Sequence, residues 1–408
     1  MTYPTISPKL TLDFANSRQL DPRITFSRSS SATYVHPDTG LVTTAPDGVA
    51  RFEKEGLLIE EARTNLVRTS TPTGSGLSNG WSQRASTTIT TNADVAPDGT
   101  TTATSVVADV GSTDYAYTDG NLASATTADC AVSAFAKPIN NMPSVVLKAG
   151  ISDGGAVIWN FNFQTGATTL NFETGGATGF GSTAFMEPLA NGWFRVGFTA
   201  PAGTNDIVVN ARESWGGSQP AGDGVTGCLW WGCQIEEGDF QTSFIPTAGS
   251  TVTRAADVAS ITGTNFSSWW KQDQGTLGFD FNSFGREFVQ NCRVLYLFSS
   301  TTSGNSIDVT TGTKTSQGII IKSGGASEVQ LVTRKFLVNG KHMLGLKEDD
   351  FALAQNGETP FTDTSGLMPV DVNELRMTYS NIFLNGHFSR LSYYDRRVSD
   401  AALQALTS

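Results

Sequence analysis

Two pairs of adjacent carboxylates stand behind apolar runs in this sequence, and paired carboxylates are the groups that cleave glycosidic bonds. Glu60 and Glu61 follow Leu57-Leu58-Ile59, and Glu236 and Glu237 repeat the pattern far downstream. Carboxylates on two different strands can reach the separation that such cleavage requires. Adjacent residues of one strand point to opposite faces, however, so neither pair can act together from its own strand.

The alternative role of these carboxylates is structural, and the sequence favours it. The first and last strands of a jelly roll lie near each other, so we expect the acidic ends of two neighbouring strands to meet arginines such as Arg63 and Arg254. A third role is a structural Ca²⁺ ion held by carboxylate and carbonyl oxygens near the strand ends.

Trp215 is the leading candidate for contact with a sugar. It lies in "ARESWGGSQPAGDGVTG", a segment rich in Gly between two predicted strands, with Arg212 and Glu213 close by. A tryptophan offers a flat apolar face and a polar tip together, and the two charged side chains can form hydrogen bonds with hydroxyl groups. The alternative, in which Trp215 packs under its own loop, stays open.

A second candidate segment is "GSTDYAYTDGN", which contains Asp114, Tyr115 and Tyr117. Alternate residues of a strand share one face, so the two tyrosines would form a common platform for a sugar ring. An ordinary cross-strand aromatic pair is the alternative.

Other tryptophans are better explained by packing. Trp230 and Trp231 are adjacent in a predicted strand, so one should face the core and the other the opposite side. Trp269 and Trp270 fall in the link between two predicted domains, where we expect them to pack between the domains.

The histidines and cysteines form no pattern typical of a metal site or a nucleophilic centre. None of the histidines has another potential ligand or catalytic residue at a typical spacing in the sequence; they are His36, His342 and His387. Only two of the cysteines are close together, in a Cys-x4-Cys spacing without a second pair, and we expect all four to be small core residues: Cys130, Cys228, Cys233 and Cys292.

The net charge of −11, with only 16% charged residues, argues against nucleic acid or an anionic membrane surface as a partner. No apolar run approaches the length of a membrane span. The first residues, "MTYPTISPKLTLDF", lack a basic segment followed by an apolar stretch, so we expect no secretory signal.

The elements that must position these residues are predicted to be almost entirely β-strands. Short apolar runs are separated by turn residues about every 8–12 residues, which is typical of sandwiches and jelly rolls. One strand series ends and another begins between residues 250 and 265. We therefore predict an all-β chain of two consecutive antiparallel β-sandwiches, with one helix near the C-terminus, in "SDAALQALTS", capped by Ser399 or Asp400.

The segments "LDFANSRQLDPRITFSRSSSATYV", "GLLIEEARTNLV" and "QIEEGDFQTSFIPTAGSTVTRAADVASI" resemble the signature of a family of phage and prophage virion proteins. Such proteins pair a carbohydrate-binding jelly roll with a concanavalin/laminin-G-like sandwich, and "FLNGHFSRLSYYDRRVSDAALQALT" is similar to the closing strands of the latter. The resemblance implies an N-terminal β segment over residues 1–68 packed on the first sandwich, a jelly roll over 69–260 and a second sandwich over 261–408.

Members of this family look like tail fibres, receptor-binding proteins or head spikes, including those of gene transfer agents. The resemblance therefore implies a non-enzymatic appendage on the surface of a virion or phage-like particle, which attaches to capsular or other host polysaccharide. The expected partners are that polysaccharide, other virion proteins and further copies of the chain. A purely structural decoration or adaptor protein is the first alternative, and a glycan depolymerase is the second, although no short repeat typical of a β-helix is present.

Overall fold

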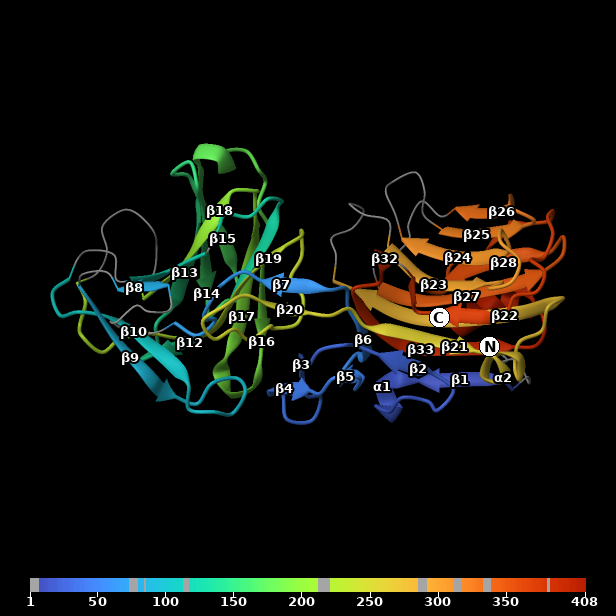
Figure 1. Cartoon of the computed structure of the whole chain (residues 1–408), viewed down its shortest axis with the longest axis horizontal. Coiled ribbons are helices and arrows are strands. Elements are labelled where there is room, and N and C mark those ends of the chain that lie inside the picture. Colours follow the sequence, from blue (N-terminus) through green and yellow to red (C-terminus); the bar gives the residue numbers. More distant parts are fainter. Residues whose placement is uncertain are drawn as a thin grey trace. The chain divides into compact units, whose positions relative to one another are not determined.

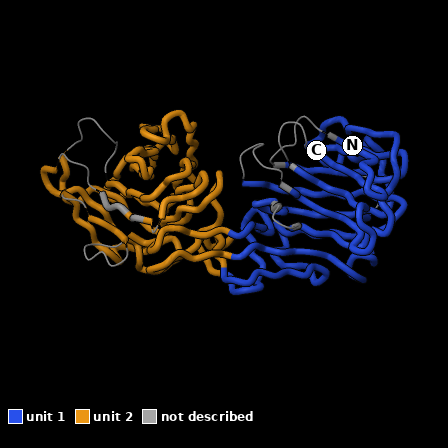
Figure 2. Tube along the Cα trace, turned by 45° about the horizontal axis from the view of Figure 1, so that its top comes forward, with its two compact units in different colours: residues 1–31, 45–62, 255–408 blue, residues 32–44, 63–254 orange. Residues whose placement is uncertain are grey.

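The computed structural model describes residues 7–72, 80–83, 86–112, 117–122, 124–211, 221–284, 292–311, 318–332, 339–379 and 382–408. The chain folds into two compact β units, which Figure 2 colours separately. Unit 1 comprises residues 1–31, 45–62 and 255–408, and unit 2 comprises residues 32–44 and 63–254. Both units consist of antiparallel sheets, so the predicted all-β fold is confirmed.

Unit 1 is a sandwich of an eight-stranded and a seven-stranded sheet, in the orders β29-β28-β27-β22-β33-β6-β5, with β1 also paired to β33, and β2-β21-β30-β23-β24-β25-β26. Most of its strands are labelled in Figure 1. They are β1 (Leu10–Asp13), β2 (Thr25–Ser27), β5 (Arg51–Glu53), β6 (Gly56–Ile59), β21 (Val258–Thr262), β22 (Gln274–Ser283), β23 (Cys292–Phe298), β24 (Ser306–Thr311), β25 (Gly318–Ser323), β26 (Ala326–Val332), β27 (Asn339–Lys347), β28 (Phe351–Gln355), β29 (Phe361–Asp363), β30 (Glu374–Arg376), β31 (Thr378–Tyr379), β32 (Ile382–Phe383) and β33 (Gly386–Tyr394).

The N-terminal segment completes unit 1, which corrects the expectation that residues 1–68 pack on the first sandwich. Strands β1 and β6 both pair with β33, and β2 pairs with β21. Leu10, Leu12, Leu57 and Ile59 enter the same core as β22 residues such as Phe279. Only residues 32–44 and those from 63 onward belong to unit 2. The strands of this segment find their partners at sheet edges formed by residues far away in the sequence, which local patterns do not reveal.

Helices are few and short in the part of the chain described: α1 (Phe14–Ser17), α2 (Thr264–Ser267) and α3 (Asp400–Thr407). In α3, the side chain of Ser399 accepts a hydrogen bond from the backbone N–H of Ala402, so the predicted cap is confirmed. Leu403 of α3 is fully buried against β27 and β28. No helix among the described residues has the length and apolar character needed to cross a membrane.

Unit 2 is a sandwich of two six-stranded sheets, in the orders β16-β17-β12-β19-β10-β9 and β15-β14-β13-β18-β11-β8. Its elements are β3 (Ala32–Val35), β4 (Val42–Ala45), β7 (Arg63–Asn65), β8 (Trp81–Gln83), β9 (Thr87–Asp94), β10 (Ala103–Ala108), β11 (Tyr117–Asn121), β12 (Cys130–Ile139), β13 (Ser144–Ile151), β14 (Ala156–Asn162), β15 (Thr168–Thr174), β16 (Ala184–Pro188), β17 (Phe194–Ala200), β18 (Thr204–Asn210), β19 (Gly227–Glu237) and β20 (Val252–Arg254), with 3-10 turns η1 (Gly175–Ala177) and η2 (Ala190–Gly192).

Trp230 and Trp231 of β19 face opposite sides of their sheet, as predicted. Trp230 belongs to the core between the two sheets of unit 2, and Trp231 to a smaller cluster on the other face, against Phe135 and Phe244. Both indoles are buried, so neither serves as a free surface for a ligand.

Trp269 and Trp270, which we expected to pack between two domains, pack within unit 1. Trp269 is buried against Phe266 and Tyr393, and Trp270 lies against the same two rings. The short helix α2, which contains Phe266, brings these rings together over the end of the unit 1 core.

Candidate functional site

Glu60 is part of a buried network of charges and not of a catalytic groove. Its carboxylate contacts Arg51 at 2.8 Å, and Arg51 contacts Asp257 at 2.6 Å. Asp257 in turn binds Arg28 at 3.0 Å, and the side chains of all four residues are fully inaccessible to solvent. Two positive and two negative charges therefore compensate one another inside unit 1.

Glu61 points the other way, as adjacency in an extended chain requires, and its carboxylate accepts a hydrogen bond from the amide of Asn385 at 3.0 Å. Arg51 of the neighbouring strand is thus an arginine partner of Glu60. Of the two arginines expected from the sequence, Arg63 lies close enough to Glu237 for its charge to act on that carboxylate. Arg63 and Arg254 lie opposite each other in the register of β7 and β20.

Glu236 and Glu237 are also engaged in structural contacts, in unit 2. The buried carboxylate of Glu236 accepts hydrogen bonds from the backbone N–H and the hydroxyl of Thr242, at 2.7 and 2.6 Å. Glu237 accepts hydrogen bonds from the backbone N–H and hydroxyl of Thr127, which lower the pKa of its carboxyl group. The structural interpretation of both carboxylate pairs therefore agrees with these contacts, but the pairs lie in different units and not on neighbouring strands.

Most of the predicted sugar-binding residues lie outside the described residues: Asp114, Tyr115, Arg212, Glu213 and Trp215. Tyr117 is the first residue of β11, and its backbone pairs with that of Asn210, the last residue of β18. Residues 113–116 precede this pair directly in the sequence, and residues 212–220 follow it after Ala211 alone. The two candidate segments, about a hundred residues apart, thus join the sheet at the same pair of strand ends.

Strand β18 also carries polar side chains on the face of its sheet that points away from the core of unit 2. Ile207 and Val209 belong to the core of unit 2, so Asp206, Val208 and Asn210 face the other side. We call these three residues the β18 strip. Asp206 accepts a hydrogen bond from the backbone N–H of Gly150 at 2.5 Å, in the space that the absent side chain of that glycine leaves.

Asn210 is the unusual member of the β18 strip. Its side chain is fully buried, yet neither its amide nitrogen nor its amide oxygen has a hydrogen-bond partner among the described residues. The face on which it lies is mixed, since buried Val146 and Ile158 share it with Lys148 and Asn160. A buried amide without partners costs about 1–3 kcal/mol, so a group of this kind calls for a reason.

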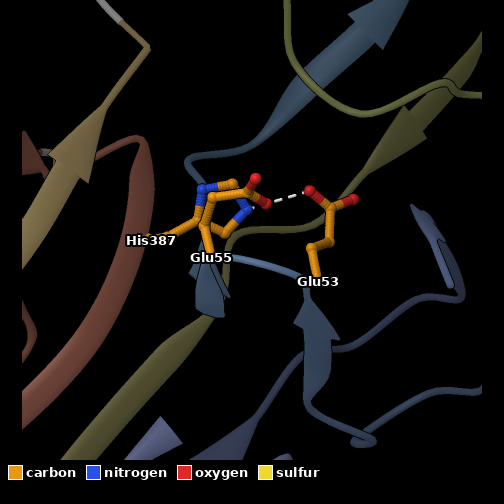
Figure 3. A group of neighbouring side chains, drawn as sticks. All are labelled: Glu53, Glu55 and His387. Atoms are coloured by element: carbon orange, nitrogen blue, oxygen red, sulfur yellow. Dashed lines mark hydrogen bonds and ion pairs between the residues drawn. The ribbon is translucent and has the colours of Figure 1, made fainter. Parts of the chain in front are cut away.

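A further cluster was missed by the sequence analysis. Glu53, Glu55 and His387 bring one potential ligand atom each to within 4.8 Å of one another (Figure 3). His387 is 334 residues away from Glu53, so no spacing in the sequence announces the cluster.

The other two histidines are not part of such a cluster. His36 packs beside Tyr34 in the β3–β4 hairpin. His342 is buried and stacks against the rings of Phe279 and Phe281, and burial lowers its pKa to about 4. The three cysteines whose side chains are described, Cys130, Cys228 and Cys233, are buried and free, as expected for core residues.

Comparisons with known proteins found no matching family model and no matching curated protein. Among solved structures, the CBM40 of a Ruminococcus gnavus IT-sialidase is similar at 14% identity and a TM-score of 0.27, over 34% of this chain and 84% of that one. Domains LG4-5 of the mouse laminin alpha1 chain are similar at 9% identity and a TM-score of 0.21, over 79% and 90% of the two chains. With TM-scores this low, neither likeness says what this chain binds.

Proposed function

We propose that this chain is a non-enzymatic appendage of a virion or phage-like particle, and that it binds polysaccharide on the surface of a host cell. The observation that carries the proposal is the backbone pair of Tyr117 and Asn210, because both candidate sugar-binding segments join the sheet at this pair of strand ends.

The chemistry of this sheet end suits a sugar. Asp206, which is half-buried and lies on the same face four residues before Asn210, offers a carboxylate acceptor for a sugar hydroxyl group. In this proposal Trp215 and the tyrosines Tyr115 and Tyr117 stack on the ring, while Arg212, Glu213 and Asp114 hydrogen-bond its hydroxyl groups.

The contacts of the paired carboxylates support a function without catalysis. Glu60 and Glu236 are both fully buried, in an ion-pair network and in hydrogen bonds to Thr242. A general acid or nucleophile for glycoside cleavage must reach the glycosidic oxygen or the sugar ring, and neither side chain has access to a substrate.

The virion location rests on the resemblance of the N-terminal and central segments to phage and prophage appendages. In that setting the chain assembles with further copies of itself and with other virion proteins. Several weak sugar sites on one rigid body bind a repeating polysaccharide far more strongly than a single site.

The experiment is to measure binding of the purified, fluorescently labelled protein to encapsulated bacteria and to an isogenic strain without capsule. We expect binding to the encapsulated cells only, and no release of reducing ends from purified capsule. Trp215→Ala should weaken a single site by roughly tenfold or more, if stacking contributes about 1–3 kcal/mol as it does for bases. Phe361→Ala, which removes an exposed aromatic side chain of unit 1, is the matched control and should bind as the unaltered protein does.

Two outcomes would overturn the proposal. Equal binding to both strains would favour a decoration or adaptor protein that recognises only other particle proteins. Steady release of reducing ends, lost in a Glu→Gln variant, would make the protein a depolymerase.

A further inference from the structure

The cluster of Glu53, Glu55 and His387 in unit 1 is built by two segments from opposite ends of the chain. Glu53 is the last residue of β5, Glu55 lies in the tight turn before β6, and His387 lies in β33 (Figure 3). The ring nitrogen Nε2 of His387 is 2.9 Å from a carboxylate oxygen of Glu53. One potential ligand atom from each of the three side chains lies within 4.8 Å of the other two.

The backbone holds this turn firmly against β33. Gly56, with φ +132°, has no room for a side chain, because a Cβ atom there would lie 2.1 Å from the carbonyl oxygen of Phe388. The hydroxyl of Ser389 donates a hydrogen bond to the carbonyl oxygen of Glu55 at 2.7 Å. These contacts hold the backbone of the turn that carries Glu55 beside β33.

The histidine itself is held in place and shielded from water. Its side chain is only 4% exposed, and Phe284 packs edge-on against its ring at a centroid distance of 5.0 Å. The second ring nitrogen, Nδ1, is buried and has no hydrogen-bond partner among the described residues. A buried imidazole aimed at two carboxylates is an arrangement that proteins use to hold metal ions.

The charges of the cluster also favour a cation. One carboxylate would suffice to pair with His387, and the second, on Glu55, adds repulsion between two negative groups. A divalent cation compensates both carboxylates at once and leaves the imidazole neutral, which is the form that binds metal.

We propose that Glu53, Glu55 and His387 bind a divalent transition-metal ion of the Zn²⁺ class. Imidazole nitrogen together with carboxylate oxygen suits such ions, whereas Ca²⁺ and Mg²⁺ prefer oxygen ligands alone. Ligand atoms on one tetrahedral zinc lie about 3.4 Å apart, and the exposed side chain of Glu55 is free to rotate toward the other two ligands. The ion leaves one coordination position for water and clamps the β5–β6 turn to β33.

The test is a titration of the full chain, prepared without a polyhistidine tag, with Zn²⁺ alone and with Ca²⁺ alone by calorimetry. His36→Gln serves as the background, because His36 is the partly exposed histidine of unit 2 and could bind zinc adventitiously. We expect one Zn²⁺ per chain and no comparable Ca²⁺ binding. Co²⁺, used as a visible probe, should give the absorption bands of a four-coordinate site.

In this background, Glu55→Gln and His387→Gln should each weaken Zn²⁺ binding by more than tenfold, since even the loss of an outer-shell partner costs about 10–100-fold. Glu348→Gln, which removes an exposed carboxylate elsewhere in unit 1, should leave binding unchanged. Because Glu55 is exposed, its variant folds even if His387→Gln does not. Zinc binding that is absent, or equally strong in Glu55→Gln and Glu348→Gln, would overturn the proposal.

Discussion

Asn210 and Asn65 are two fully buried asparagines of unit 2 that differ in how their amides are satisfied. The amide nitrogen of Asn65 donates to the carbonyl oxygens of Cys233 and Ile245, and its oxygen accepts from two backbone N–H groups. Asn210 has no such partners among the described residues. A buried amide that no described residue pairs lowers the stability of the fold around it.

We therefore predict that Asn210→Leu raises the stability of unit 2. An apolar side chain of similar shape relieves an unpaired amide, so a gain of about 1 kcal/mol, or a rise in Tm of about 2–4 °C, is expected. Thermal unfolding provides the measurement. The matched change Asn65→Leu should lower stability by several kcal/mol, because it leaves four buried backbone groups without their hydrogen-bond partner. A destabilised Asn210→Leu variant would show that the amide of Asn210 is paired in the folded protein.

His342 makes the stability of unit 1 depend on pH. Burial lowers its pKa from 6.5 to about 4, so the folded protein takes up this proton less readily than the unfolded chain. The neutral imidazole stabilises the folded state in full above about pH 6.5, and this stabilisation is lost as the pH falls toward 4. The difference between the two pKa values corresponds to about 3 kcal/mol.

Denaturant unfolding at a series of pH values from 7 to 4 would measure this loss. His342→Gln should remove most of it, and His36→Gln, which alters the partly exposed histidine of unit 2, should keep the slope of the unaltered protein. Carboxyl groups also titrate in this range, so the difference between the two variants is the quantity to compare. Identical slopes would show that His342 does not titrate in this way.

At the scale of elements, the neighbours Glu60 and Glu61 offer a direct comparison at the end of β6. Glu60 lies in the buried network with Arg51 and Asp257, whereas Glu61 is half-buried and binds Asn385. Glu60→Gln leaves the buried charges unbalanced and should destabilise unit 1 by about 3–5 kcal/mol. Glu61→Gln should cost about 1 kcal/mol or less. Urea unfolding of both variants distinguishes these effects, and equal stabilities would show that the network does not hold the strand ends together.

At the scale of the whole molecule, the chain passes from one unit to the other four times, because residues 32–44 and 63–254 form unit 2. A fragment of residues 261–408, the second sandwich as the sequence delimits it, lacks β1, β2, β5, β6 and the first three residues of β21. The edge of β33 that pairs with β1 and β6 would then be open. Exposed strand edges of this kind favour aggregation.

We predict that residues 261–408 expressed alone are insoluble or lack cooperative unfolding, and that this fragment is not rescued by changes of buffer. Co-expression of residues 1–62 with residues 255–408 should restore a folded unit 1, since it supplies the missing strands and the partners of Asp257. Circular dichroism melts of the two preparations provide the measurement. A cooperative melt of the short fragment alone would contradict the shared core.

The sequence by itself determined what local patterns encode. The strand character of most of the chain follows from short apolar runs and turn residues, the opposite faces of Trp230 and Trp231 follow from the two-residue period of a strand, and the start of α3 follows from Ser399. Each of these depends on residues within a few positions of one another, so no knowledge of distant partners is needed.

Only the tertiary structure decided which distant segments pair. It placed β1 and β6 against β33, joined Glu60 to Arg51 and Asp257, and brought His387 to Glu53 across 334 residues. Strand pairing depends on which sheet edges are open and which side chains fit across them, and a strand carries the same alternating pattern whichever edge it joins. For this reason the carboxylates could be recognised as structural from the sequence, while their partners, and the cluster around His387, could not.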